Sequence, residues 1–174
     1  MNLQPNSIKY SYPITIYSNI NIEVKELINK LVSDFYNNLP KEKIGDLEYT
    51  LNITYDTKIY KDYTTYIFYI DTYTGGAHSN NKVITFTYHK KERVYIKKII
   101  GNNIEKLSNY IRNDLYKRKG FLKDMVEEGT TANLYNYKNF YYDEKGITFI
   151  FNPYQVAPYV YGFIEITVPY SLFE

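Results

Sequence analysis

The chain has 174 residues, enough for one domain with a sizeable core. It contains no cysteine, which excludes a disulfide framework, a cysteine-based zinc site and a thiol nucleophile. Its net charge of +2 is too small to indicate nucleic-acid binding. No apolar stretch approaches the roughly 20 residues that a membrane helix requires. We therefore expect a single domain, residues 1–174, that binds no nucleic acid and reaches a membrane only through a segment absent from this sequence.

Tyrosine is the unusual feature of the composition, with 23 tyrosines and no tryptophan. Together with the many Asn, Ile and Lys residues, this usage is typical of an AT-rich coding sequence. Tyrosines on a surface would also suit protein or sugar recognition, because each ring offers an apolar face and a hydroxyl group. The composition alone leaves both interpretations open.

The first part of the chain predicts a strand and then a helix. Residues 8–17 are rich in β-branched and aromatic side chains. Pro13 within them indicates an edge strand or a bulged strand, because proline lacks the N–H that a central strand uses. Apolar side chains then recur three and four positions apart over residues 20–35, which predicts a helix. Asn19 or Asn21 could cap its start.

The middle of the chain returns to strand patterns. Apolar and polar side chains alternate over residues 47–60, 63–74 and 83–88, which predicts three successive antiparallel strands in a meander. Residues 94–96 continue the strand pattern. A second main helix is predicted over residues 104–115, where the apolar positions again fall on one side.

The last third predicts a short helix at residues 121–128 and a hairpin formed by residues 137–142 and 147–151, with Gly146 in its turn. Residues 163–170 are predicted to form a closing strand. The whole pattern predicts an α+β fold. We expect an antiparallel β-sheet, built from the meander and the C-terminal hairpin, with the two main helices packed on one face.

The bend at the end of Tyr69–His78 is the first candidate site. Gly75 and Gly76 supply the positive φ angles that a sharp reversal needs. One interpretation is a binding corner, at which Thr74, His78 and exposed backbone N–H groups meet a partner. The other is that His78 only forms a hydrogen bond across the loop and holds its shape.

Patterns typical of catalysis are missing from the sequence. It contains no H-E-x-x-H pair, no G-x-S-x-G turn and no glycine-rich phosphate loop. The scattered carboxylates include Asp71 beside the bend and Asp143 and Glu144 in the hairpin turn, where acids usually form the turn. A hydrolase that uses Asp71 and His78 is the enzymatic alternative. We expect no enzymatic activity, no metal ligands and no cofactor.

Three motifs resemble the RsiV-like extracytoplasmic domain. They are Thr74–His78 after an aromatic strand, the stretch Tyr142–Tyr159, and the ending Ile164–Tyr170. The opening Tyr10–Pro13, followed by a helix, also fits the first half of that family, so the resemblance covers nearly the whole chain. Such domains form the outer part of the anti-sigma-V lysozyme sensor, and they precede the catalytic domain in some peptidoglycan deacetylases.

The resemblance implies binding rather than catalysis. It implies a recognition domain that binds a protein ligand such as lysozyme, outside the membrane of a Gram-positive-type cell, as part of cell-envelope stress sensing. The candidate ligand-binding residues lie in two loops and are Tyr73, Thr74, Gly75, Gly76, His78, Asn152, Tyr154 and Tyr159. The sequence has no sigma-binding segment, membrane helix or deacetylase domain. We therefore expect the outer domain of a larger protein or a stand-alone exported relative.

The alternative function is a cell-wall accessory module that binds glycan, in particular peptidoglycan. Tyrosine rings would stack on sugars, and Lys and Arg side chains would lie near wall anions. An exposed row of tyrosines would favour the glycan, and a contiguous apolar patch rimmed by polar groups would favour a protein partner. A deep cleft that holds Asp71 beside His78 would favour the enzyme.

Overall fold

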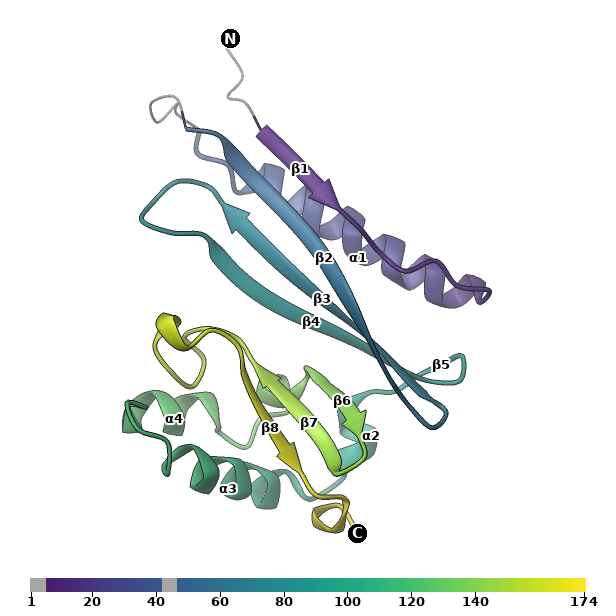
Figure 1. The fold of residues 1–174 in the computed structure, drawn as a ribbon, viewed down its shortest axis with the longest axis vertical. Helices are drawn as coiled ribbons and strands as arrows, with labels where there is room; N and C mark the ends of the chain where they lie inside the picture. The colour runs from purple at the N-terminus through teal and green to yellow at the C-terminus, as the bar shows by residue number, and fades with distance from the viewer. Residues whose placement is uncertain (1–5, 42–46) are drawn as a thin grey trace. The chain divides into compact units, whose positions relative to one another are not determined.

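The computed structural model describes residues 6–41 and 47–174 and has a mixed α+β fold, which confirms the predicted class. One sheet has five strands in the order β1-β2-β3-β4-β5, and the other has three in the order β6-β7-β8 (Figure 1). The strands are β1 (Asn6–Tyr10), β2 (Tyr49–Tyr60), β3 (Tyr63–Tyr73), β4 (Asn80–His89), β5 (Glu92–Arg93), β6 (Phe140–Asp143), β7 (Gly146–Phe151) and β8 (Ile164–Val168). The helices are α1 (Ser18–Asn37), α2 (Ile96–Ile100), α3 (Ile104–Leu115), α4 (Lys123–Gly129), η1 (Leu134–Tyr137), η2 (Tyr159–Tyr161) and η3 (Tyr170–Leu172).

The chain folds as two compact units. The first unit holds the chain up to Asp56 together with Phe68–Lys82, and the second holds Thr57–Ile67 together with Val83–Glu174. The three long strands of the predicted meander, β2, β3 and β4, are confirmed, and each contributes residues to both units.

The first unit has its core between α1 and the sheet. The side chains of α1 at the predicted three- and four-residue spacing are buried, and they are Ile20, Val24, Ile28, Leu31 and Phe35. They lie on the side of the helix that the periodicity indicated. Alternate residues of β2 are buried in the same way, at Tyr49, Leu51 and Ile53. In Figure 1, α1 runs alongside β1 and β2.

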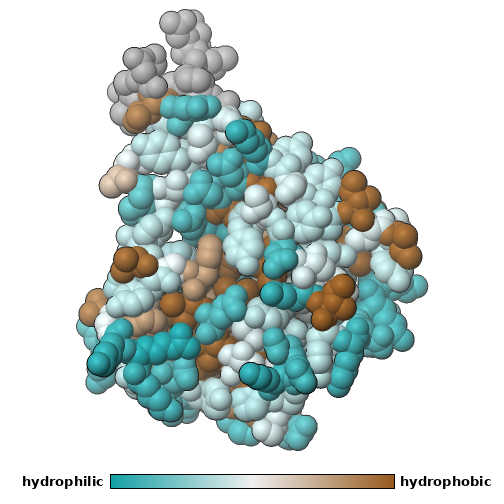
Figure 2. Space-filling model, viewed as in Figure 1, coloured by the Kyte–Doolittle hydropathy of each residue, from teal (hydrophilic) through white to brown (hydrophobic). Residues whose placement is uncertain are grey.

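The strand predicted over residues 8–17 is shorter than expected. β1 ends at Tyr10 and pairs parallel to β2, because the connection between them is the helix α1 rather than a hairpin. The Ser11 N–H donates to the Ile53 carbonyl at 2.9 Å. Pro13, two residues later, has no N–H with which the ladder of hydrogen bonds could continue. The connection that follows leaves Ile14 and Ile16 84% and 91% exposed. Hydrophobic groups are visible there, at the right edge of Figure 2.

The start of α1 differs from the predicted asparagine cap. The helix begins at Ser18, with Tyr17 in the cap position and no side-chain cap. The side chain of Asn21 instead accepts from the Thr15 N–H and donates to the Thr15 carbonyl, both at 2.8 Å. Asn21 therefore holds the chain that enters the helix rather than the helix end itself.

The second unit packs α3 against the three-stranded sheet. All six residues of β7 are buried, as expected for a central strand, and alternate residues of β8 are buried. Leu107, Ile111 and Leu115 of α3 join Phe149 and Phe151 of β7 in one hydrophobic cluster. The two predicted main helices thus belong to different units, α1 to the first and α3 to the second.

The strand predicted at residues 94–96 is wrong. β5 covers only Glu92–Arg93, and Ile96 begins the short helix α2. Ile96 and Ile100 lie four residues apart, so both fall on one helical side and enter the cluster of the second unit. A run of three residues is too short to distinguish the helical period from the strand period.

A phenol in β6 makes the stability of the second unit depend on pH. Tyr141 is 7% exposed and donates to the Glu165 carboxylate at 2.9 Å. Burial, followed by this hydrogen bond, raises the pKa of Tyr141 to about 12. The folded state thus favours the neutral phenol. Its contribution to stability is complete below about pH 10 and is lost as the pH rises towards about 12.

We therefore expect the free energy of unfolding of wild type to fall more steeply than that of Tyr141→Phe between about pH 10 and about pH 12. Urea denaturation of both proteins across that interval measures the difference. Tyr110→Phe, which changes an exposed tyrosine of α3, serves as the control. Parallel pH profiles for wild type and Tyr141→Phe would contradict the assignment.

Candidate functional site

The bend between β3 and β4 forms in the first unit as predicted. Gly75 and Gly76 have φ angles of 95° and 110°, which a side chain would strain. The Tyr73 hydroxyl donates to the Gly76 carbonyl at 3.2 Å, across the bend. His78 is exposed, and its Nδ1 lies 2.7 Å from the carbonyl oxygen of Ser79. This contact is to the next residue rather than across the loop, and both interpretations of His78 stay predictions.

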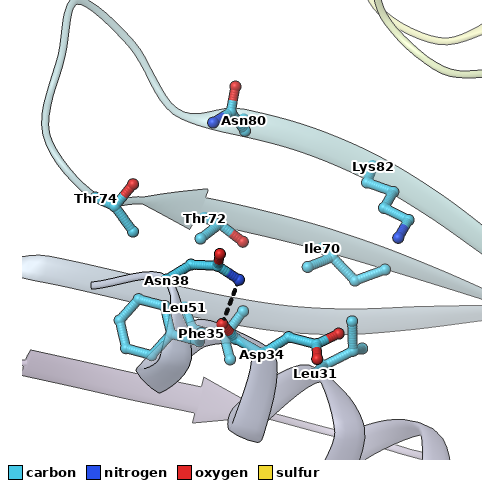
Figure 3. A pocket seen from close by; sticks show the side chains of 10 residues that line it. All are labelled: Leu31, Asp34, Phe35, Asn38, Leu51, Ile70, Thr72, Thr74, Asn80 and Lys82. Atoms are coloured by element: carbon cyan, nitrogen blue, oxygen red, sulfur yellow. Dashed lines mark hydrogen bonds between the residues drawn. The ribbon is translucent and has the colours of Figure 1, made fainter. Parts of the chain in front are cut away.

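Thr74 borders a cavity of about 260 Å³ in the first unit (Figure 3). The cavity lies between α1 and strands β2, β3 and β4. Its apolar side chains are Leu31 and Phe35 of α1, Leu51 of β2 and Ile70 of β3. Its polar side chains are Asp34, Asn38, Thr72, Thr74, Asn80 and Lys82. The sequence indicated Thr74 but gave no sign of the space beside it.

The second predicted loop, Asn152–Tyr159, lies in the second unit and is held by its own polar groups. The Asn152 side-chain oxygen accepts from the Val83 N–H at 2.6 Å. The Gln155 N–H donates to the Asn152 carbonyl at 3.0 Å, and the Gln155 amide reaches the Asn136 carbonyl at 3.1 Å. Asn152, predicted to bind a ligand, thus anchors the loop to β4.

Apolar contacts complete the anchoring of this loop. Val156 and Ala157 are buried, with 0% and 3% exposure. Gly129, at the end of α4, lies so close to the loop that a Cβ there would be 1.9 Å from the Gln155 carbonyl oxygen. The loop therefore has little freedom to shift towards α4.

The outer side of the same loop is aromatic and exposed. The rings of Tyr154 and Tyr159 have their centroids 5.4 Å apart. Tyr154, Val160 and Tyr161 are 57%, 85% and 41% exposed, and hydrophobic groups are visible over η2 in Figure 2. No residue from 152 to 161 carries a charged side chain. We call this surface, Tyr154 with Tyr159, Val160 and Tyr161, the aromatic loop surface.

The side chains of two asparagines, Asn152 and Asn139, form hydrogen bonds with the backbone edge of β4. The Asn139 amide accepts from the Thr85 N–H at 3.2 Å and donates to the Val83 carbonyl at 3.0 Å, so it takes the place of a neighbouring strand. The hydroxyls of Thr85 and Thr87 bond the N–H and the carbonyl of Phe140 at 2.9 and 3.0 Å. Sequence reasoning missed Asn139, because no local pattern marks an asparagine whose partners lie more than 50 residues away.

A further group of aromatic rings lies in the second unit. The rings of Tyr63 and Tyr142 stack with centroids 3.8 Å apart, and those of Tyr142 and Tyr170 with centroids 6.4 Å apart. Tyr60 extends the group, with its centroid 6.4 Å from that of Tyr170. All four side chains are half-buried. Composition indicated many tyrosines, but it could not show that these four gather.

Residues 6–41 and 47–174 contain neither a metal-type cluster nor a membrane-type helix. Within them, no group of three or more His, Asp or Glu side chains is arranged to hold a metal ion. No helix in this part of the chain has the length and apolar character needed to cross a bilayer.

Comparison with known proteins identifies related sequences and folds. The search of curated proteins found no match. A solved protein of the DUF3298 family from Bacteroides fragilis is similar with 24% identity and a TM-score of 0.57, over 88% of this chain and 64% of that one. The present chain thus spans less than two thirds of that protein. A DUF3298 family protein from Pseudomonas aeruginosa is similar with 12% identity and a TM-score of 0.62, over 88% and 76% of the two chains.

At these identities the two structures show a shared fold and no more. The sequence match covers a shorter part of the chain, from α2 to η3, which includes the aromatic loop surface and Asn139. Residues 96–171 match the model of a family described as a protein of unknown function, DUF3298.

Proposed function

We propose that this chain is a non-enzymatic extracytoplasmic recognition domain that binds a protein ligand such as lysozyme, as part of cell-envelope stress sensing. The aromatic loop surface is the observation that supports the proposal. Tyrosine is enriched in the cores of protein interfaces and charged residues are depleted there, and residues 152–161 have both properties. The extracytoplasmic location rests on the resemblance to the RsiV-like domain.

The anchoring of the loop adds to this argument. Association costs conformational entropy when a loop has to become ordered, so a loop already fixed by Asn152, Gln155 and Gly129 loses less on binding. Residues 152–161 carry no charge of their own, although the chain's net charge of +2 opposes the approach of a basic protein. Lysozyme is such a protein.

We expect Tyr154→Ala to weaken lysozyme binding by at least about tenfold, because truncation removes the most exposed tyrosine of the aromatic loop surface. Calorimetric titration of the full chain with lysozyme at two salt concentrations measures the affinity. The uncharged surface predicts a weak dependence on salt. Tyr110→Ala, which removes an exposed tyrosine of α3, is the matched control and should bind like wild type.

The second candidate function, glycan binding, is favoured by the stacked rings of Tyr60, Tyr63, Tyr142 and Tyr170. The faces of Tyr63 and Tyr142 that stack on each other, with centroids 3.8 Å apart, are closed to a sugar, so a glycan would contact the outer faces and edges of this group. Sedimentation with insoluble peptidoglycan, run on the same protein sample, separates the two functions. Retention on peptidoglycan without lysozyme binding would overturn the first proposal and support the second.

A further inference from the structure

The cavity beside Thr74 has an apolar floor of buried side chains. Leu31, Phe35, Leu51 and Ile70 are all at most 9% exposed, so the floor consists of core side chains that belong to the fold. A volume of about 260 Å³ lies just below the roughly 300 Å³ at which pockets for drug-sized ligands begin. The space therefore suits a ligand with only a few carbon atoms.

The charges at one end of the cavity are not balanced. In Figure 3, the Lys82 side chain extends from β4 towards α1, at the same end of the cavity as Asp34. The Asp34 carboxylate is already paired with Lys30, 2.6 Å away on the next turn of α1. Within the described residues, Lys82 has no ion-pair partner, so one positive charge remains.

Neutral polar groups border the remaining side of the cavity. The hydroxyls of Thr72 and Thr74 and the amide of Asn80 can each donate or accept a hydrogen bond. Asn38 donates to the Asp34 carbonyl at 2.7 Å, so its amide group is held in place. The cavity thus combines an apolar floor, neutral hydrogen-bonding groups, the Lys82 ammonium and the Asp34 carboxylate, which is paired with Lys30.

We propose that this cavity binds a small amphipathic anion, a short apolar chain that ends in one carboxylate. The apolar chain lies on Phe35, Leu51 and Ile70, and the carboxylate lies at the Lys82 ammonium. A single lysine favours a compact, singly charged head group, whereas phosphate recognition generally adds an arginine or a helix N-terminus. The site lies in the first unit, so the proposal is independent of the aromatic loop surface in the second.

Three probes with the same six-carbon chain test the head group. Hexanoate, hexanol and hexylamine are each titrated into the isotopically labelled full chain, and the backbone amide shifts are followed by NMR. We expect hexanoate to bind best, about tenfold more tightly than hexanol, with the largest shifts at residues 31–38, 70–74 and 80–82. Equal binding of the three probes, preference for hexylamine, or shifts elsewhere in the chain would each overturn the proposal.

Two lysine variants test the position of the charge. Lys82 is exposed, so Lys82→Met should fold normally, and we expect it to bind hexanoate no more tightly than hexanol. Lys25→Met is the matched control, because Lys25 is an exposed lysine of α1 that does not border the cavity, and it should keep the preference for hexanoate. Hexanoate affinity that is unchanged in Lys82→Met would also overturn the proposal. Neither result depends on lysozyme or peptidoglycan binding.

Discussion

Replacing Asn139 by leucine is expected to lower the free energy of unfolding by about 3 kcal/mol. Asn139 is 4% exposed, and its amide satisfies the N–H of Thr85 and the carbonyl of Val83. Leucine has a similar size but no polar group, so both backbone groups would remain buried without a partner. Each such group costs about 1 to 3 kcal/mol.

Urea denaturation followed by circular dichroism measures this effect. The matched control is Asn113→Leu, which makes the same exchange at an exposed position of α3 and should change stability by less than about 0.5 kcal/mol. If Asn139→Leu unfolds at the same urea concentration as wild type, the amide does not complete the edge of β4.

The second large effect is expected for Gly129→Ala, again with a loss of about 3 kcal/mol. A Cβ at position 129 would lie 1.9 Å from the Gln155 carbonyl oxygen and 2.9 Å from a methyl carbon of Val156. Neither obstacle is the end of a flexible side chain, so the backbone of the loop has to move. Under the proposed function, Gly129→Ala should also weaken lysozyme binding, because the same loop carries Tyr154.

Gly101→Ala separates this crowding from the ordinary cost of losing a glycine. Gly101 has a φ of 52° and no atom within 4 Å of the added Cβ, so only the backbone preference is lost. That preference is worth about 1 to 3 kcal/mol, because a φ of 52° with a ψ of −121° lies outside the left-handed helical region that other residues occasionally adopt. Thermal and urea unfolding of both variants compare the two costs. A Gly129→Ala protein as stable as wild type would show that the loop adapts without strain.

Periodicity was sufficient where an element buries one continuous side. The helix predicted over residues 20–35 is α1, because its buried positions recur at the helical period. The strand predicted over residues 47–60 is β2, whose buried positions at Tyr49, Leu51 and Ile53 recur at the strand period. The pattern could not reveal that β1 runs parallel to β2. That direction depends on the crossover through α1 rather than on the residues of the strand.

The candidate site was predictable only in part, for a similar reason. The bend at Gly75 and Gly76 has a local cause, and the structure has the expected φ angles there. The contact of Tyr154 with Tyr159 is also local, and both residues were in the predicted loop. The cavity beside Thr74 is different, because a helix and three strands form it together. No short stretch of sequence encodes such a space.

β4 is synthesised well before the side chains that complete its edge. Asn139 follows Thr85 by 54 residues, and Asn152 follows Val83 by 69. Because the ribosome adds residues from the N-terminus, the backbone of β4 emerges long before the side chains that occupy its edge. An unoccupied strand edge can pair with another chain. Nascent chains that stall before Asn139 are therefore expected to associate on the polysome. Chains released after Asn152 contain both asparagines that occupy the edge of β4, so we expect them not to associate.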